Sequence, residues 1–226
     1  MKVKKKDKVG MIPKHSSHSG LSREAWSKLN EGKSVSLEFI PEMAEPYIEE
    51  VKKGKKSELL WILEHPTTYT AGVRYNKNEI LDKNIKIIQS NRGGKITLHN
   101  PGQKIIYFVI NLNDRKKDIR KFINAIEQSI IQFLKDFNIS ANSDKKNIGI
   151  WVDYKKIAAI GIRVSRWIAY HGCSINISNN LDQYLKIVPC GLSNKKVTSI
   201  FREKKIKPRN YETKLARILI KNINKI

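Results

Sequence analysis

The chain has 226 residues, of which 40% are hydrophobic, enough to build one domain with a substantial buried core. Its longest apolar runs, at 59–63 and 105–110, fall far short of the roughly 18–20 residues that span a bilayer, so no membrane segment is expected. Two cysteines cannot form a disulfide framework, and no apolar run follows the basic N-terminus as in a secretory signal, so we expect a cytosolic protein with reduced thiols.

The net charge is +23, with 34 lysines and 10 arginines against 21 acidic residues, and it favours an acidic partner. Nucleic acid is one candidate. However, base readout favours arginine and single-strand binding favours exposed aromatic residues, whereas the aromatic residues here lie mostly inside apolar runs. A basic nucleic-acid-binding module therefore stays as an alternative of a different class, and the composition does not favour it.

Hydrophobic periodicity predicts a globular domain that follows a basic tail. Residues 1–20 carry several lysines and no apolar period, which predicts a disordered tail, and the domain is expected at 21–226. The clearest helix is 119–137, where apolar residues recur every three or four positions and make one wide apolar face. The run at 104–112 is continuously apolar, which is typical of a strand buried on both faces.

The other expected elements follow from shorter patterns of the same kind. Helices are expected at 23–30, at 42–53, at 181–187 and from 197 to the end, and strands at 58–64, 85–89, 148–152, 157–164 and 167–177. A sharp turn is expected at Pro189, Cys190 and Gly191. The predicted fold class is α+β: a single domain in which a mixed, largely antiparallel sheet is flanked by helices.

Residues 92–103 are unusually permissive for the backbone, because they hold three of the chain's twelve glycines and a proline between two apolar runs. Thr97 and His99 alternate as they would on one face of a short strand, and a Pro-Gly pair ends the segment with turn chemistry. We expect something to approach Gly93 and Gly94 closely, and phosphate, nucleic acid and an acyl chain are the candidates.

The common motifs of nucleotide, zinc and serine-hydrolase sites are absent from the sequence: it has no G-x-x-x-x-G-K-[ST], G-x-G-x-x-G, H-E-x-x-H, C-x-x-C or G-x-S-x-G. The run 93–97 resembles a shortened phosphate-binding loop, but it lacks the first glycine of that motif and no helix is expected to begin after it. A metal site built from His99, His171, Cys173 and Cys190 has no recognisable ligand spacing.

Cys190 is a candidate nucleophile, because its Pro-Cys-Gly turn can present the sulfur at an edge of the fold. A small buried hydrophobe is the plain alternative, since free cysteine is among the most buried residue types. A reactive thiol needs a pKa below its ordinary value of about 8.5, so a cation must lie close to it. The candidate cations are His99, His171 and Lys156, the last of which precedes a glycine-containing apolar strand.

Four short motifs occur in a fixed order: R-G-G-K-I-T-L-H-N-P-G-Q at 92–103, K-I-A-A-I-G at 156–161, H-G-C-S-I-N at 171–176 and P-C-G-L at 189–192. Together they resemble the lipoyl(octanoyl) transferases, the lipoate-protein ligase B family, over about residues 59–200. The resemblance implies the fold shared by biotin and lipoate protein ligases. Asn100 stands where the family usually has glycine, and because asparagine tolerates left-handed dihedrals we expect the turn to persist.

The resemblance implies transfer of an octanoyl group from octanoyl-acyl carrier protein to a lysine of a lipoyl domain, in 2-oxoacid dehydrogenases or the glycine cleavage H protein. It places the nucleophile on Cys190, which would carry the acyl group as a thioester, and its activating cation on Lys156. No cofactor and no metal are implied, because conversion of a thioester to an amide runs downhill. The implied acyl pocket is lined by Arg92, Gly93, Gly94, Lys95, Ile96, Thr97, Leu98, His99, Ala159, Ile160, Gly161, Gly172, Cys173 and Ser174.

Both implied protein substrates are typically acidic, so the basic charge would speed encounter with each of them. The rival within the same fold is an ATP-dependent lipoate-protein ligase. Such an enzyme would use a lysine to hold an acyl-adenylate and would not need Cys190.

Overall fold

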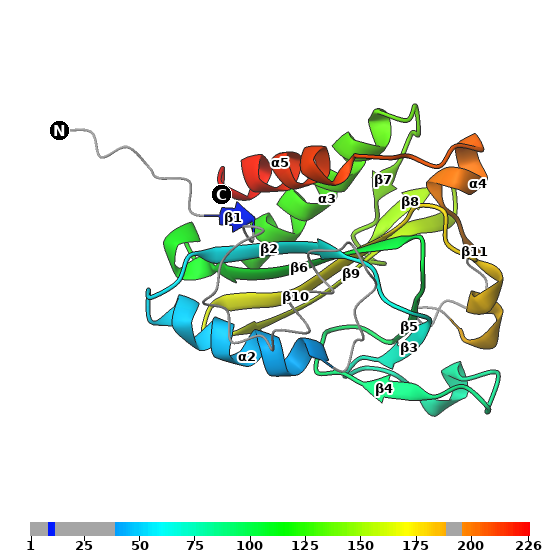
Figure 1. Cartoon of the computed structure of the whole chain (residues 1–226), viewed down its shortest axis with the longest axis horizontal. Helices are drawn as coiled ribbons and strands as arrows, with labels where there is room; N and C mark the ends of the chain where they lie inside the picture. The colour runs from blue at the N-terminus through cyan, green and yellow to red at the C-terminus, as the bar shows by residue number, and fades with distance from the viewer. Residues whose placement is uncertain (1–8, 12–38, 189–195) are drawn as a thin grey trace.

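The computed structural model describes residues 9–11, 39–188 and 196–226, and a large twisted sheet forms its centre (Figure 1). The sheet has eight strands in the order β1-β2-β6-β10-β9-β8-β7, and β11 pairs with β9. The strands are β1 (Val9–Met11), β2 (Glu58–Leu63), β6 (Gln103–Asn111), β7 (Asn142–Ser143), β8 (Ile150–Val152), β9 (Lys155–Ser165), β10 (Ile168–Asn176) and β11 (Lys196–Val197). Among the described strands of this large sheet, the β1–β2 and β9–β11 pairs are parallel and the others antiparallel, so the mixed, largely antiparallel sheet is confirmed.

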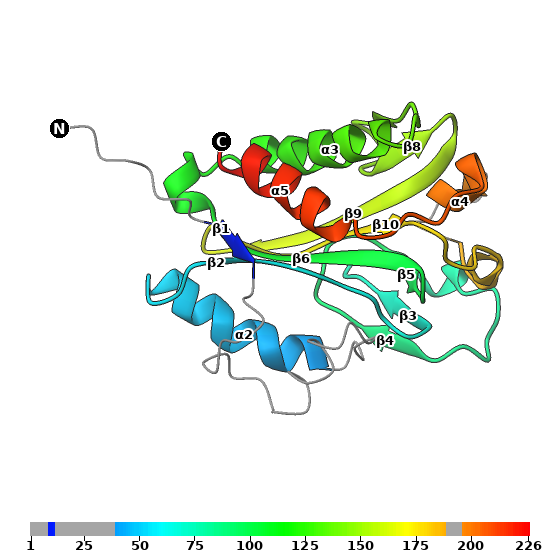
Figure 2. The same ribbon diagram turned by 45° about the horizontal axis from the view of Figure 1, so that its top comes forward.

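Helices cover one face of the large sheet, and a helix and a second, smaller sheet lie on the other. Figure 2 shows α3 (Ile119–Lys135) and α5 (Glu212–Ile223) on one side, and α2 (Phe39–Lys52) with the small sheet opposite. The small sheet has the order β4-β3-β5, from β4 (Ile87–Gln89), β3 (Thr68–Ala71) and β5 (Ile96–His99). The remaining elements are short: α4 (Ile200–Lys204) and the 3₁₀ turns η1 (Lys77–Glu79), η2 (Leu112–Arg115) and η3 (Asp182–Lys186).

The main core lies between α3, α5 and the large sheet. Asp118 caps α3, because its side chain accepts a hydrogen bond from the backbone N–H of Lys121 at 2.9 Å. The apolar face of α3 is buried against β6, where Phe122 meets Phe108 edge-on with 6.0 Å between the ring centroids. The period of three and four residues therefore identified the helix and the face that it buries.

Strands β9 and β10 form a long hairpin that supplies one wall of the molecule's main cavity. Arg166 and Trp167 both have positive φ, as a two-residue turn between twisted strands requires. Within the hairpin, Gly161 pairs directly with Gly172, so neither strand carries a Cβ atom at this level. A Cβ atom on Gly172 would lie 1.7 Å from the carbonyl oxygen of Ile106, so this glycine lets β10 pack tightly on β6.

The chain ends differ from the sequence predictions. The disordered tail expected at 1–20 does not hold for Val9–Met11, which form β1 and pair in parallel with β2; the other tail residues and the helix expected at 23–30 lie outside the described residues. The single helix expected from 197 onward is also wrong. Lys205 has a left-handed φ of 58° that ends α4, and Pro208 follows before α5 begins.

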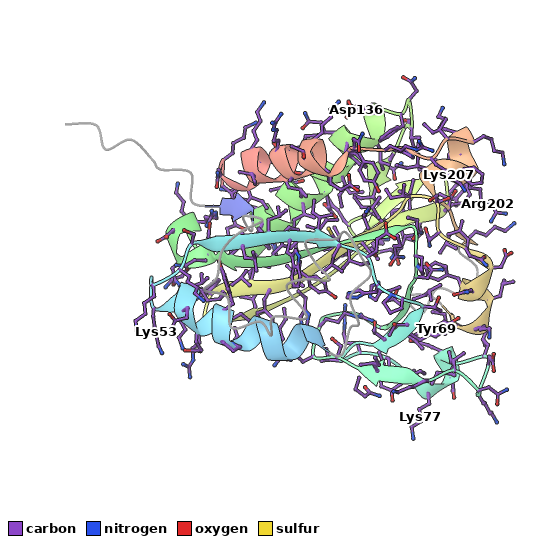
Figure 3. All side chains as sticks on the ribbon, viewed as in Figure 1. Lys53, Tyr69, Lys77, Asp136, Arg202 and Lys207 are labelled. Atoms are coloured by element: carbon purple, nitrogen blue, oxygen red, sulfur yellow. The ribbon has the colours of Figure 1, made fainter. Side chains whose placement is uncertain are left out.

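Positive charge is spread over the described surface. Figure 3 shows Lys53 at the lower left, Lys77 at the bottom, and Arg202 and Lys207 at the upper right of the molecule, and all four side chains are exposed. Within the described ranges, every helix is too short or too polar to traverse a lipid bilayer.

Candidate functional site

A cavity of about 1060 Å³ opens between the large sheet and the small sheet. Its walls come from β5 and the loop before it, from the β9–β10 hairpin and from β6, so the four sequence motifs contribute at least three segments to one space. The predicted pocket residues that line it are Arg92, Gly93, Gly94, Lys95, Ile96, Thr97, His99, Ala159, Ile160, Gly161, Gly172, Cys173 and Ser174, and Lys156 lines it as well. The tertiary fold thus brings residues 92–99 beside segments that begin more than 50 residues later in the sequence.

Leu98 is the exception among the predicted pocket residues. Successive side chains of a strand point to opposite faces, so Leu98 projects away from the face that carries Thr97 and His99. It is fully buried in a second apolar cluster with Tyr69 and Tyr184. Leu98 is not among the residues that line the cavity, and it packs the small sheet against η3.

Lys156 lies at the start of β9 and is held in the cavity wall by neutral groups. Its side chain is only 8% exposed, and its ammonium donates to the carbonyl oxygen of Ile148 at 3.2 Å. The same Nζ lies 4.7 Å from the ring centroid of Trp151, in a cation–π contact. Gly149 leaves the space for this side chain, because a Cβ atom there would lie 3.0 Å from Lys156 Cε. The adjacent Lys155, in contrast, pairs with Glu203 at 2.7 Å.

Cys190 lies outside the described residues, so its pairing with Lys156 stays a prediction. The chain re-enters the description at β11, where Val197 pairs with Lys156 and the backbone N–H of Thr198 donates to the Lys156 carbonyl oxygen at 2.9 Å. The segment that follows Cys190 in the sequence is therefore anchored beside Lys156.

The two histidines that were candidate cations are neutral in this fold. Burial, helped by the charges of His65 and Arg92, lowers the pKa of His99 to about 3. Burial, Arg92 and Arg163 lower the pKa of His171 to about 4. Of the three candidate cations, this leaves Lys156.

The cavity's own cysteine is a poor nucleophile. Cys173 is buried and unpaired with another cysteine, and burial raises the pKa of its thiol far above the ordinary range. It stays protonated at neutral pH and behaves as a small apolar wall residue. Nor do the described residues contain any group of three or more histidine, cysteine or acidic side chains that could hold a metal ion.

The lowered histidine pKa values predict that the protein loses stability on mild acidification. Each folded-state pKa lies below the ordinary value of 6.5, so the unfolded chain binds more protons and the stability present above pH 6.5 falls as pH decreases. We expect the free energy of urea unfolding to decrease between about pH 6.5 and 5, a range above most carboxylate titrations. His171→Gln should make this pH dependence shallower, and an unchanged slope would contradict the assignment.

The glycines of residues 92–94 make room for the protein's own backbone. A Cβ atom on Gly93 would lie 2.7 Å from the carbonyl oxygen of Ile162 in β9. On the other side of the loop, a Cβ atom on Gly72 would lie 2.5 Å from the carbonyl oxygen of Gly94. Arg92 completes the arrangement by donating to the carbonyl oxygen of Thr70 at 2.8 Å. At Gly93, then, the close neighbour is a strand of this chain, and the loop is fixed against the cavity's far wall.

Gly93→Ala should therefore destabilise the protein although it adds a single methyl group. We expect the free energy of unfolding to fall by about 1–3 kcal/mol, because the new methyl meets backbone that cannot rotate away. Gly161→Ala is the matched control on the opposite side of the same contact: its Cβ would lie 3.2 Å from the Gly93 carbonyl oxygen. Denaturant unfolding should show the smaller loss in Gly161→Ala; the reverse order would refute this account.

Asn100 keeps the turn after β5 without the left-handed backbone that was expected. It is not among the residues with positive φ, and Gly102 (φ 84°) takes that conformation in its place. The Asn100 side chain is buried, donates to the carbonyl oxygen of Asn180 at 2.8 Å and accepts from Asn179 at 2.9 Å. It ties the turn to the segment after β10.

Other parts of the cavity wall carried no recognisable signal in the sequence. Tyr107 lines the cavity from the middle of β6, where it reads as one more apolar position, and it is hydrogen-bonded to the buried His65 at 2.8 Å. Lys145 and Lys146 line it from a polar turn, and Arg74 from the loop after β3. These residues are recognised as part of the cavity wall only once the fold has brought distant segments together.

Comparisons with known proteins agree with this geometry. The family model described as the lipoyl protein ligase A/B catalytic domain matches residues 41–219. The octanoyltransferase of Bartonella bacilliformis is 46% identical over 63% of this chain and 65% of its own length, just under two thirds. Those of Anaplasma marginale and Rickettsia rickettsii are 41% and 42% identical over 74% of this chain, and the matches cover 78% and 83% of those proteins.

Solved structures share the fold at low sequence identity. A lipoate-protein ligase A bound with ATP superposes with a TM-score of 0.61 at 14% identity, covering 79% of this chain and 77% of that one. A bipartite lipoate protein ligase from Thermoplasma acidophilum gives 0.59 at 12% identity, covering 85% and 81%. These likenesses confirm the predicted lipoate-ligase-like α+β fold.

Proposed function

Since this chain belongs to the octanoyltransferases of the lipoyl protein ligase A/B family, we propose that it transfers an octanoyl group from octanoyl-acyl carrier protein to a lysine of a lipoyl domain through a thioester on Cys190. The observation that carries the proposal is the placement of Lys156. It is a buried ammonium in the cavity wall, held by neutral groups and adjoined by the strand that follows Cys190 in sequence.

Lys156 can move the protons that this reaction requires. In the first step the Cys190 thiolate forms an S–C bond to the octanoyl carbon, the donor's C–S bond breaks, and the Lys156 ammonium protonates the leaving thiolate. In the second step the neutral Lys156 amine takes a proton from the incoming lysine ammonium. That lysine's nitrogen then displaces Cys190 to form the amide, and its second proton leaves to solvent. The cycle ends with the Cys190 thiolate and the Lys156 ammonium restored.

The cavity suits an acyl chain. Ala159, Gly161 and Gly172 leave a smooth wall on the β9–β10 side, and His99 and His171 are uncharged. Because the pKa of Cys173 is raised, this second thiol does not compete with Cys190 for the acyl group. An apolar wall with a few placed polar groups is the usual design of a small-molecule site.

Exposed basic side chains of the cavity lining suit acidic protein substrates. Arg74, Lys145 and Lys146 are exposed and line the cavity, which agrees with the strongly positive net charge of +23. Acceptors of this kind would include lipoyl domains of 2-oxoacid dehydrogenases and the glycine cleavage H protein.

The test is a transfer assay in which the acyl donor and ATP are varied separately. With octanoyl-acyl carrier protein and an apo lipoyl domain, we expect the lipoyl domain to gain one octanoyl group without ATP. With free octanoate and ATP we expect no transfer. Modification that required ATP would show the ATP-dependent ligase activity, and no modification under either condition would reject both functions.

A further inference from the structure

Behind the cavity wall, a chain of buried amides runs from a backbone carbonyl to His99. The Asn176 amide nitrogen donates to the carbonyl oxygen of Thr198 at 2.9 Å. The Asn176 side-chain oxygen accepts from the Gln103 amide nitrogen at 2.8 Å, and Gln103 Oε1 lies 2.8 Å from His99 Nδ1. All three side chains are at least nine-tenths buried, so solvent does not replace any of these contacts.

The direction of this chain follows from its first member. A backbone carbonyl can only accept, so Asn176 must turn its NH₂ group toward Thr198 and its oxygen toward Gln103. Gln103 must then turn its NH₂ group toward Asn176 and its oxygen toward His99. An amide oxygen can only accept, so the hydrogen in this last contact belongs to His99 Nδ1.

The neighbouring side chains support the same orientation. Asn179 also donates to the Asn176 oxygen, at 3.3 Å, and the hydroxyl of Tyr184 accepts from Gln103 Nε2 at 2.9 Å. Reversing Gln103 would place two oxygens against each other at the Asn176 contact and an NH₂ group against the His99 nitrogen. The backbone carbonyl of Thr198 thus sets the tautomer of a histidine far away in sequence.

His99 Nε2 is therefore a hydrogen-bond acceptor on a side chain that lines the cavity. His99 lines the cavity, its Nδ1 is occupied by Gln103, and no residue of the described ranges donates to Nε2. Because the pKa of His99 is about 3, the ring does not gain a second proton at neutral pH. The nearby titratable or charged groups, His65 and Arg92, also lower the pKa of His99.

His99 and Lys156 line the same cavity, and Thr97 connects the two positions. Thr97 is two positions before His99 on the same face of β5, roughly 7 Å along the strand. Thr97 borders a small recess together with Lys156, Ala159 and Ser174. His99 thus lies two residues along β5 from a side chain that shares this recess with Lys156.

We propose that His99 Nε2 accepts a hydrogen bond from the amine of the acceptor lysine and orients that amine for attack on the acyl-enzyme, with Gln103 and Asn176 as positioning residues. The inference rests on the proposed function. Of the two substrates, the thioester presents only acceptors at its reacting atoms, whereas the lysine presents N–H groups, so a permanent acceptor matches the lysine. His99 gains no proton in the step, because the protons pass to Lys156 and to solvent.

The test separates the two half-reactions by intact-mass analysis of the full-length protein. His99→Phe keeps a planar ring without the acceptor, and we expect acylation by octanoyl-acyl carrier protein within about 3-fold of wild type but discharge by an apo lipoyl domain slowed about 10–100-fold. Gln103→Met should slow discharge less than His99→Phe, because a fraction of the molecules still carries the His99 hydrogen on Nδ1 and leaves Nε2 as an acceptor. Tyr184→Phe is the matched control, since it alters the same buried network and leaves Asn176 to hold Gln103; discharge should be near wild type.

The possible results distinguish this inference from the proposed function. A wild-type protein that forms no adduct would reject the proposed function itself. Normal adduct formation with equal discharge in wild type and His99→Phe, or a parallel loss of both half-reactions, would overturn the role of His99. Nitrogen-15 NMR of the wild-type His99 ring gives a test that does not need a folded variant: protonated Nδ1 and bare Nε2 are expected, and a proton on Nε2 would overturn the assignment.

Discussion

Cys190→Ser should abolish the octanoyl adduct and lower octanoyl transfer by about 10³-fold or more, the scale of loss when a nucleophile is removed. A serine hydroxyl has almost no anionic form near neutral pH, so the Lys156 ammonium cannot activate it as it would a thiol. Intact-mass analysis after mixing with octanoyl-acyl carrier protein measures the result directly. Wild type should gain the mass of one octanoyl group, and an apo lipoyl domain should remove it.

Cys173→Ala is the matched control, because it removes the chain's other thiol. Since the Cys173 thiol is buried and its pKa is raised, this variant should still carry one adduct. An adduct that persists in Cys190→Ser, or one that disappears only in Cys173→Ala, would refute the thioester on Cys190.

Lys156→Met should lower the rate of transfer by about 10²–10³-fold, the usual contribution of a positioned acid and base. Methionine has a similar length and apolar stem, so it can fill the space beside Gly149 and Trp151 without leaving a buried charge. If Lys156 and Cys190 form the proposed pair, loss of the Lys156 cation should also raise the pKa of the Cys190 thiol. Its alkylation by iodoacetamide should then require higher pH than in wild type.

Lys155→Met separates this effect from a general loss of positive charge. Lys155 is the preceding residue in β9 and pairs with Glu203, so its removal should leave the rate within about 2-fold of wild type. Equal losses in the two variants would show that Lys156 acts only as surface charge. An unchanged alkylation profile in Lys156→Met would show that Lys156 does not lower the thiol pKa.

Local patterns were sufficient for most of the secondary structure. The three- and four-residue period of 119–137 identified α3, and the apolar run at 104–112 identified the central strand β6. The pattern failed where a local backbone feature overrode it. The sequence pattern after residue 197 predicts one helix, but α4 ends at the left-handed Lys205, and Pro208 follows before α5 begins.

The order of four short motifs was sufficient for the family, although no motif alone identified it. The family match and the cavity wall agree with that order, from Arg92 to Ser174. Leu98 differs from the other predicted pocket residues, since it does not line the cavity and is fully buried in the cluster with Tyr69 and Tyr184.

The sequence by itself determined which chemical groups this protein has and the family to which it belongs, because composition, periodicity and motif order are properties of the chain. Only the tertiary structure decided which of these groups are charged and which residues they pack against. His99 and His171 are neutral because burial and Arg92 disfavour their charged forms, and Gly93 is glycine because β9 passes against it. Both depend on segments far apart in sequence, since desolvation and close packing arise only when those segments meet.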